Sequence, residues 1–461
     1  MEFINLEKIE GNFVVLENEE SSYNEVVEIK IDGKKKLGQV VEIDKNKVIV
    51  QVLGDIQGFS LNNTSVKFLK HPMEIKLSEE ILGRVFNGLG EPIDNLGEIY
   101  FECKKNINGS AINPVSRVYP RNYIQTGISS IDGLATLIRG QKLPIFSGNG
   151  LPHDKLAAQI VRQASLGNNS NEKFGVVFVA MGVKYDVAEY FKKSFEESGA
   201  MERVVMFLNL ANDSVAERII TPRLGLTTAE YLAYEKNMHV LVILTDMTAY
   251  AEALREIASG KGEIPGRKGY PGYLYSELAS LFERAGIIKN SSGSVTQIPI
   301  LTMPNDDITH PVADLTGYIT EGQIVLDRNL FNKGIYPPVN ILPSLSRLMK
   351  DGIGEKFTRE DHQDLANQIF SAYAHVNDVR ALAGIIGEDE LNETDKAYMI
   401  FGRCFEKFYL GQSDLENRNI FETIELGWKL LGLLPEKELN RVNKKFLDKY
   451  YKKTVESDFY G

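Results

Sequence analysis

Cysteine and long apolar runs are both scarce in this chain of 461 residues. Its two cysteines, Cys103 and Cys404, lie far apart, which argues against a disulfide scaffold and a zinc knuckle and fits a reducing cytoplasm. No stretch approaches the roughly 18 consecutive apolar residues of a membrane span. The first residues also lack a basic segment followed by an apolar one. We therefore expect a soluble chain that serves any membrane from the aqueous side, without inserting.

Positive charge is also in short supply. The 63 acidic residues outnumber the 52 lysines and arginines, and the formal net charge is −11. Because such a surface repels phosphate backbones on average, nucleic acid is not expected as the main partner. The six histidines form neither an i, i+4 helical pair nor another ligand cluster, so we expect no metal site built from protein ligands.

What the chain does have is enough apolar residues for several domains. At roughly 150 residues per domain its length predicts about three, and 43% of the residues are hydrophobic. Residues 26–53 alternate in strand fashion, which favours a small β-barrel or sandwich that ends near His71 and Pro72. Between residues 174 and 342, nearly continuous apolar runs such as 176–179, 204–208 and 240–244 alternate with helical segments. This pattern is typical of a parallel α/β sheet covered on both faces.

Beyond about Lys356 the apolar residues recur at helical spacing, which predicts a bundle of helices. Asn392 and Asp395 are placed as a cap and its partner for one of them. We therefore divide the chain into domains over residues 1–72, 73–355 and 356–461. Three stripes carry the helical prediction: Leu365, Ile369, Phe370 and Tyr373; Ala397, Ile400, Phe401, Cys404, Phe405 and Phe408; Leu439, Val442 and Phe446.

The segment 143–156 has the layout of a phosphate-binding loop, an apolar strand that runs through a glycine-containing turn into a helix. In G-x-x-x-x-G-K-[ST], backbone N–H groups and the Lys hold phosphates, and the hydroxyl holds magnesium. Here Ser147 stands at the first Gly, and Pro152, His153 and Asp154 replace the second Gly, the Lys and the Ser/Thr. Proline lacks an N–H and Asp154 adds negative charge, so the segment is either a loop with weak or no nucleotide binding or a functionless turn. The candidate residues of this degenerate loop are Ser147, Gly148, Asn149, Gly150, His153 and Asp154.

Two further positions bear on hydrolysis. The run 240–244 ends in Thr245 and Asp246, as in the magnesium-positioning strand of P-loop ATPases, although an aspartate that caps the next helix is an equal explanation. Where a carboxylate would position the attacking water, the chain offers Val183. Hydrolysis in a site of this chain's own is therefore not expected, and whether the chain counts as an enzyme stays open.

Six segments resemble the non-catalytic B subunit of the vacuolar/archaeal-type rotary ATPases, and the similarity covers essentially the whole chain. SGNGLPHDKLAAQI resembles the degenerate loop that separates this subunit from the catalytic A subunit. The resemblance implies an N-terminal β-barrel, a central RecA-like α/β domain of the P-loop type and a C-terminal α-helical bundle. The segments are LGRVFNGLGEPID (82–94), QTGISSIDGL (125–134), SGNGLPHDKLAAQIVRQA (147–164), LTDMTAYAEALREIA (244–258), PGRKGYPGYLYSELASLFERAG (265–286) and TGYITEGQIVLDR (316–328).

The resemblance also implies a place in a complex. Three B subunits alternate with three A subunits in a ring around a central rotor stalk, with peripheral stalk subunits next to it. ATP or ADP with magnesium lies at the A–B interface and is held mainly by the A subunit. The complex couples ATP hydrolysis or synthesis to proton or sodium transport, and lies peripherally on the cytoplasmic face of the membrane.

The segment 343–348 matches the family segment that carries an arginine finger, which places the finger at Arg347. A forked, permanently charged guanidinium can neutralise the charge that grows on a transferring phosphoryl group. The alternative is an ordinary surface arginine. The glycine- and proline-rich segment 265–272 is likewise either an interface loop, as the resemblance suggests, or a simple surface loop.

Two other classes of protein remain open. A self-sufficient P-loop motor, such as a hexameric helicase or a secretion ATPase, shares the RecA-like core, but the missing Lys and Ser/Thr and the net charge of −11 oppose it. A free-standing nucleotide-binding or scaffolding module is distinguished by whether the isolated chain binds ATP with magnesium.

Overall fold

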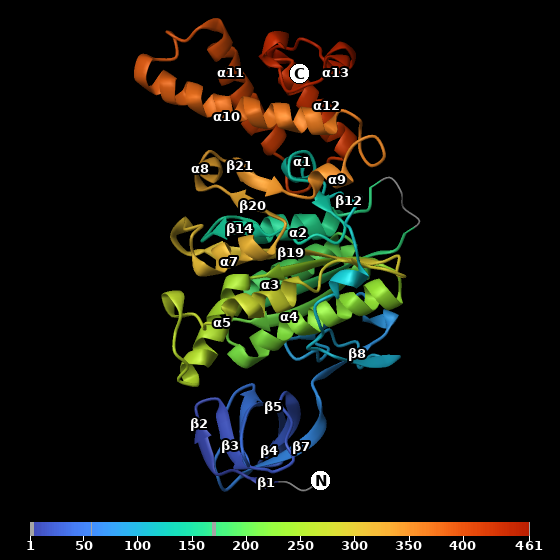
Figure 1. Ribbon diagram of the computed structural model, residues 1–461, viewed down its shortest axis with the longest axis vertical. Helices are drawn as coiled ribbons and strands as arrows, with labels where there is room; N and C mark the ends of the chain where they lie inside the picture. The colour runs from blue at the N-terminus through green and yellow to red at the C-terminus, as the bar shows by residue number, and fades with distance from the viewer. Residues whose placement is uncertain (1–3, 57, 168–171, 461) are drawn as a thin grey trace. The chain divides into compact units, whose positions relative to one another are not determined.

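The computed structural model describes residues 4–56, 58–167 and 172–460 (Figure 1). The chain forms two compact units. The first contains residues 1–116, 175–284 and 290–295, and the second contains residues 117–174, 285–289 and 296–461. Within the described ranges, no helix combines the length and the apolar character that crossing a bilayer requires.

The N-terminal part of the first unit is a curved antiparallel sheet with the strand order β1-β7-β4-β5-β6-β3-β2. β1 also lies against β3, so the sheet closes around a shared core (Figure 1, blue). Val27, Val48 and Val50 are fully buried there, as the alternation in the sequence predicts. The strands are β1 (Ile4–Asn5), β2 (Lys8–Glu10), β3 (Phe13–Glu17), β4 (Glu25–Ile31), β5 (Lys34–Asp44), β6 (Lys47–Leu53) and β7 (Thr64–Pro72).

The rest of the first unit is α/β in character. β15 pairs in parallel with β16, and β16 pairs in parallel with β9. The predicted strand runs 176–179, 204–208 and 240–244 lie in β15, β16 and β17 and are buried throughout, which confirms that both faces are covered. The elements are β8 (Glu74–Leu77), β9 (Val85–Asn87), β10 (Cys103–Asn106), β15 (Phe174–Val183), β16 (Val204–Leu210), β17 (His239–Thr245), α3 (Tyr185–Glu197), α4 (Val215–Glu230), α5 (Met247–Gly260) and α6 (Leu274–Phe282).

In the second unit, β14 pairs in parallel with β19 and β20, and β20 pairs antiparallel with β21. The degenerate loop connects β14 to α2, so it lies at the carboxyl end of a strand that has a parallel neighbour on each side. The elements are β12 (Tyr123–Ile124), α1 (Ser129–Asp132), β13 (Leu137–Ile138), β14 (Ile145–Gly148), α2 (His153–Gln163), β19 (Ser294–Met303), α7 (Pro311–Ile319), β20 (Gly322–Leu326), α8 (Arg328–Asn332), β21 (Val339–Ser346) and α9 (Met349–Gly352).

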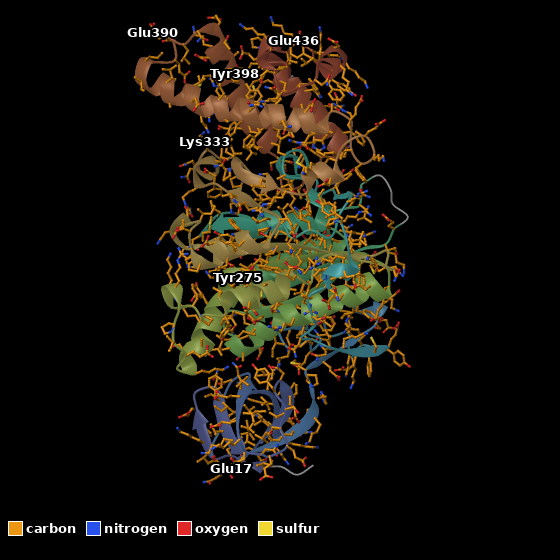
Figure 2. The ribbon with its side chains drawn as sticks, viewed as in Figure 1. Glu17, Tyr275, Lys333, Glu390, Tyr398 and Glu436 are labelled. Atoms are coloured by element: carbon orange, nitrogen blue, oxygen red, sulfur yellow. The ribbon has the colours of Figure 1, made fainter. Side chains whose placement is uncertain are left out.

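The C-terminal part of the second unit is helical, as predicted. The Asn392 side chain accepts a hydrogen bond from the Asp395 N–H at 2.8 Å, which confirms the predicted cap of α11. The turn between α10 and α11, where Glu390 lies, is exposed except at Leu391 (Figure 2). The elements are α10 (His362–Ile386), α11 (Glu393–Cys404), the π-helix η7 (Phe405–Leu410), α12 (Ile420–Leu431) and α13 (Lys444–Tyr450).

The predicted apolar stripes are only partly right. The helical spacing predicts that Phe370 is buried, but its side chain is 42% exposed. In the second stripe Phe401, Cys404 and Phe405 are buried, but Phe408 is only half-buried and Tyr409 is buried instead. The cause is η7, because a π-helical turn holds one residue more than an α-turn and shifts the buried face. The third stripe is buried, although only Phe446 of its members lies in a regular α-helix.

Candidate functional site

The degenerate loop joins the end of β14 at Gly148 to the start of α2 at His153. This is the strand-turn-helix placement that the sequence predicts. Gly150 has a φ of 78°, a left-handed conformation that glycine adopts without steric cost. Pro152 occupies the cap position of α2, where no side chain bonds the first turn. The loop therefore has the shape of a phosphate loop, and its side chains decide what it can do.

His153, at the lysine position, binds back onto the strand end. Its Nδ1 lies 3.0 Å from the hydroxyl of Ser147, which is fully buried. Its Nε2 lies 3.7 Å from a carboxylate oxygen of Asp154. The imidazole is thus engaged inside the loop, whereas a lysine at this position would extend toward phosphate oxygens.

An ion pair covers the loop at Gly148. Arg328 donates to both carboxylate oxygens of Asp306 at 2.7 and 2.8 Å, and also to the carbonyl oxygen of Asn149 at 2.9 Å. A Cβ atom at Gly148 would lie 1.9 Å from the Asp306 Oδ1, so the carboxylate is in close contact with the loop backbone. The hydrogen bond from Arg328 lowers the pKa of Asp306, which keeps that carboxylate ionised. A fixed negative charge at this point opposes the approach of a phosphate.

Asp306 and Arg328 were not predicted from the sequence. Arg328 ends one of the six family-like segments and Asp306 lies between two of them, but neither stands at a motif position of the loop. They reach the loop because β19 and β20 flank β14 in the sheet, so Asp306 follows one neighbouring strand and Arg328 follows the other. No local spacing signal could have found them.

The exposed side of α2 binds the segment after η7. The ammonium of Lys155 lies 3.2 Å from an Asp414 carboxylate oxygen and 4.5 Å from the centre of the Tyr336 ring. Arg162 donates to the carbonyl oxygen of Asp414 at 2.6 Å. Lys155 is the only lysine in the segment 143–156, and it pairs with Asp414 and Tyr336 of the second unit.

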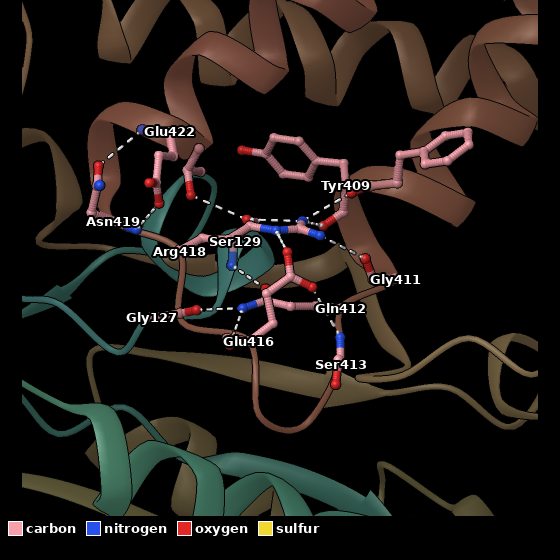
Figure 3. A network of polar contacts seen from close by, with 12 residues as sticks. Gly127, Ser129, Tyr409, Gly411, Gln412, Ser413, Glu416, Arg418, Asn419 and Glu422 are labelled. Atoms are coloured by element: carbon pink, nitrogen blue, oxygen red, sulfur yellow. Dashed lines mark hydrogen bonds and ion pairs between the residues drawn. The ribbon is translucent and has the colours of Figure 1, made fainter. Parts of the chain in front are cut away.

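A dense polar network holds residues 411–419 (Figure 3). Gln159 of α2 donates to the carbonyl oxygens of Ser413 and Glu416 at 3.0 and 3.1 Å. Arg418 donates to the Glu416 carboxylate at 2.6 Å and to the Phe408 carbonyl oxygen at 2.9 Å. The degenerate loop's helix and the C-terminal helices are thus joined by hydrogen bonds within the second unit.

Arg347 follows directly after β21 and is exposed. Its backbone N–H donates to the carbonyl oxygen of Glu321 at 2.9 Å. Its guanidinium makes no hydrogen bond or ion pair with any part of the chain that the structure describes. Arg328 and Arg418, by contrast, each donate to a carboxylate and to a carbonyl oxygen of the chain. Arg347 is therefore available to a group from outside the chain.

The surface around Arg347 is partly apolar. Arg347 lines a cavity of about 350 Å³ together with Phe146 and Gln323. At its edge Ile308 is 41% exposed and Tyr318 is 76% exposed. Exposed apolar side chains next to an available guanidinium are typical of a surface that another protein covers.

The positions that the sequence analysis considered for hydrolysis lie in the first unit. The Asp246 carboxylate accepts a hydrogen bond from the Thr248 N–H at 2.7 Å and caps α5, as the capping explanation predicts. β15 ends at Val183, which is buried. The segment 265–272 is exposed except at Tyr270 and Pro271, and α6 begins just after it at Leu274.

The histidines of the described ranges belong to no potential metal cluster. Among the residues that the structure places, no group of three or more histidine, cysteine, aspartate and glutamate side chains is arranged to hold a metal ion. His362 is fully buried, with Nδ1 3.0 Å from the Thr358 hydroxyl and Nε2 3.0 Å from the Gly133 carbonyl oxygen. Its surroundings are those of a core residue.

Comparisons with known proteins agree with this architecture. The nucleotide-binding domain of the ATP synthase alpha/beta family matches residues 127–346. The β-barrel domain of the same family matches residues 7–70, and the C-terminal domain of V and A type ATP synthases matches residues 351–451. The predicted β-barrel, α/β nucleotide-binding domain and helical C-terminal domain are thereby confirmed.

Full-length relatives extend this result. The chain is 61% identical over 456 residues to a V-type ATP synthase beta chain of Halothermothrix orenii, covering 98% of both chains. It is 58% identical over 458 residues to a V-type ATP synthase beta chain of Thermotoga neapolitana, covering 99% of both chains. The solved structure of the ATP synthase subunit NeqB from Nanoarcheaum equitans superposes with a TM-score of 0.73 at 40% identity, over 92% of this chain and all of NeqB. The chain therefore belongs to the ATP synthase alpha/beta family, as a beta chain of the V/A-type ATP synthases, the B subunit that its sequence resembles.

Proposed function

We propose that this chain completes the nucleotide sites of neighbouring catalytic A subunits and does so by presenting Arg347 to the bound nucleotide. The observation that carries the proposal is the exposed guanidinium of Arg347, which has no partner in the described parts of the chain. Arginine recognises phosphate oxygens with its planar fork and keeps its charge at any physiological pH. Supplied from a neighbouring subunit, such a group accelerates phosphoryl transfer roughly 10³- to 10⁵-fold.

The assembly that follows is a ring of three A and three B subunits, with a central rotor stalk and peripheral stalk subunits. ATP or ADP with magnesium lies at the A–B interface and is held mainly by the A subunit. The apolar side chains of Ile308 and Tyr318 next to Arg347 support an interface at this face. The complex couples ATP hydrolysis or synthesis to proton or sodium transport and lies on the cytoplasmic face of a membrane.

The chain's own loop does not turn over ATP in this proposal. His153 bonds Ser147 where a lysine would reach phosphate, and Asp306 places a carboxylate against Gly148. These contacts favour a structural loop over one with nucleotide binding at Ser147, Gly148, Asn149, Gly150, His153 and Asp154. We also propose the three domains over residues 1–72, 73–355 and 356–461.

The test is the ATPase activity of a ring reconstituted from this chain and its catalytic partner. Arg347→Ala is expected to lower kcat by roughly 10³-fold or more, with the ring still assembled on size-exclusion chromatography. Arg347→Lys restores the charge without the fork and is expected to recover only part of the rate. Arg403→Ala, which removes a half-exposed arginine on α11, is the matched control and is expected to leave kcat unchanged. An unchanged kcat in Arg347→Ala would refute the assignment.

A further inference from the structure

The backbone beneath Arg347 is held by one glutamate through two different groups. The Glu321 carbonyl oxygen accepts the Arg347 N–H at 2.9 Å. The Glu321 carboxylate accepts the N–H of Lys142 at 2.9 Å and lies 2.9 Å from the ammonium of the same lysine. The side chain of Lys142 is only 4% exposed. Glu321 therefore connects the arginine to a nearly buried cation.

Further hydrogen bonds and close packing hold the backbone around Glu321 and Arg347. The fully buried Gln141 donates to the Glu321 carbonyl oxygen at 3.2 Å and to the Ser346 hydroxyl at 2.8 Å. A Cβ atom at Gly322 would lie 2.1 Å from the Leu345 carbonyl oxygen, so β20 and β21 approach each other very closely here. With Ser346 and Arg347 both bonded, the last residue of β21 and the arginine after it have little freedom.

We infer that the ion pair of Glu321 with Lys142 positions Arg347, by fixing the backbone from which its guanidinium reaches a nucleotide. A nearly buried lysine needs its carboxylate, because an unpaired charge in that environment is strongly unfavourable. The pair thus holds Glu321 in place, and Glu321 holds the arginine's N–H. The inference rests on the proposed role of Arg347, and it makes Glu321 and Lys142 positioning residues that never touch the nucleotide.

Breaking the pair of Glu321 and Lys142 should lower the rate of the reconstituted ring. A misplacement of about 1 Å in a catalytic group can lower a rate by roughly a hundredfold. Glu321→Gln removes the charge but keeps the carbonyl bond to Arg347, so we expect kcat of the reconstituted ring to fall roughly tenfold to a hundredfold. That is less than the loss in Arg347→Ala, and KM for ATP should change little because the partner holds most of the nucleotide.

A double-mutant cycle separates positioning from general stabilisation. If Glu321 acts through Arg347, then Glu321→Gln combined with Arg347→Ala is no slower than Arg347→Ala alone. Lys142→Gln, which breaks the same pair from the other side, serves as the second variant in case Glu321→Gln fails to fold. Glu172→Gln is the matched control, because it removes a carboxylate paired at 2.7 Å with the nearly buried Arg139 of the same segment. It is expected to leave kcat unchanged.

The outcomes are distinct. Non-additive losses in either pair variant, with normal kcat in Glu172→Gln, support the inference. Additive losses, or an unchanged kcat in both pair variants while Arg347→Ala is slow, overturn it and leave the proposed function intact. An unchanged kcat in Arg347→Ala itself overturns both, since no arginine would then need positioning.

Discussion

The imidazole of His153 lies 3.0 Å from the hydroxyl of Ser147, so the residue at the lysine position of the loop bonds the residue at its first-glycine position. The loop is thereby closed by its own side chains. The Asp306 carboxylate against Gly148 adds a second obstacle, which arises outside the loop motif.

Restoring the second Gly, the Lys and the Thr of the motif should therefore not restore nucleotide binding. We expect the triple variant Pro152→Gly, His153→Lys and Asp154→Thr to bind ATP with magnesium only weakly, because the Asp306 carboxylate still repels phosphate at Gly148. Adding Asp306→Ala should strengthen binding markedly, since it removes that charge and frees Arg328. Titration of the isolated chain with a fluorescent ATP analogue measures both variants.

The control for this comparison is Asp306→Ala in the unchanged loop, which is expected to gain little affinity because His153 still occupies the lysine position. Equal affinity in the triple and quadruple variants would contradict the role given to Asp306.

Arg418 is expected to be the most important single side chain of the network in Figure 3. It donates to carbonyl oxygens of Phe408, Tyr409 and Gly411 and to the Glu416 carboxylate. Arg418→Ala removes the donor that these acceptors share, so the free energy of unfolding should fall by about 2 kcal/mol or more. Trp428 is the only tryptophan and lies buried in α12, so its fluorescence during urea unfolding reports this part of the chain.

Arg403→Ala provides the comparison, because that arginine is half exposed and lies 3.9 Å from its glutamate partner. Its loss should cost less than about 1 kcal/mol. Equal losses in the free energy of unfolding of the two variants would show that Arg418 stabilises the chain no more than an exposed arginine does.

Local features of the sequence predict the parts of the fold whose cause is local. The run 240–244 is a buried strand because five consecutive apolar residues suit a sheet covered on both faces. The loss of the phosphate-binding residues is likewise visible in the sequence, at Pro152 and His153. Asp306 reaches the loop only through the strand order, and the burial of Tyr409 in place of Phe408 follows from a π-helical turn that has no signature in the apolar spacing. Those features depend on tertiary packing, which no short window of sequence contains.

The last prediction concerns pH. Burial lowers the pKa of His362 to about 4, from an ordinary value near 6.5. Below about pH 6.5 the unfolded chain therefore binds a proton at this histidine, whereas the folded chain binds it only near pH 4. The contribution of His362 to stability is lost as the pH falls through that window. The upper limit of the loss is roughly 3.5 kcal/mol, from 1.4 kcal/mol per unit of pKa difference.

Asp132 acts in the opposite direction, because burial raises its pKa to about 7. The folded chain binds that proton more tightly than the unfolded chain, so acidification from pH 7 toward 4 adds stability there. The two effects oppose each other in the unmodified protein, and a substitution is needed to separate them. His362→Gln keeps an amide that can donate to the Gly133 carbonyl oxygen and removes the titration. Measured by Trp428 fluorescence between pH 7 and 4.5, this variant should lose less stability on acidification than the unmodified chain, and parallel pH profiles would contradict the prediction.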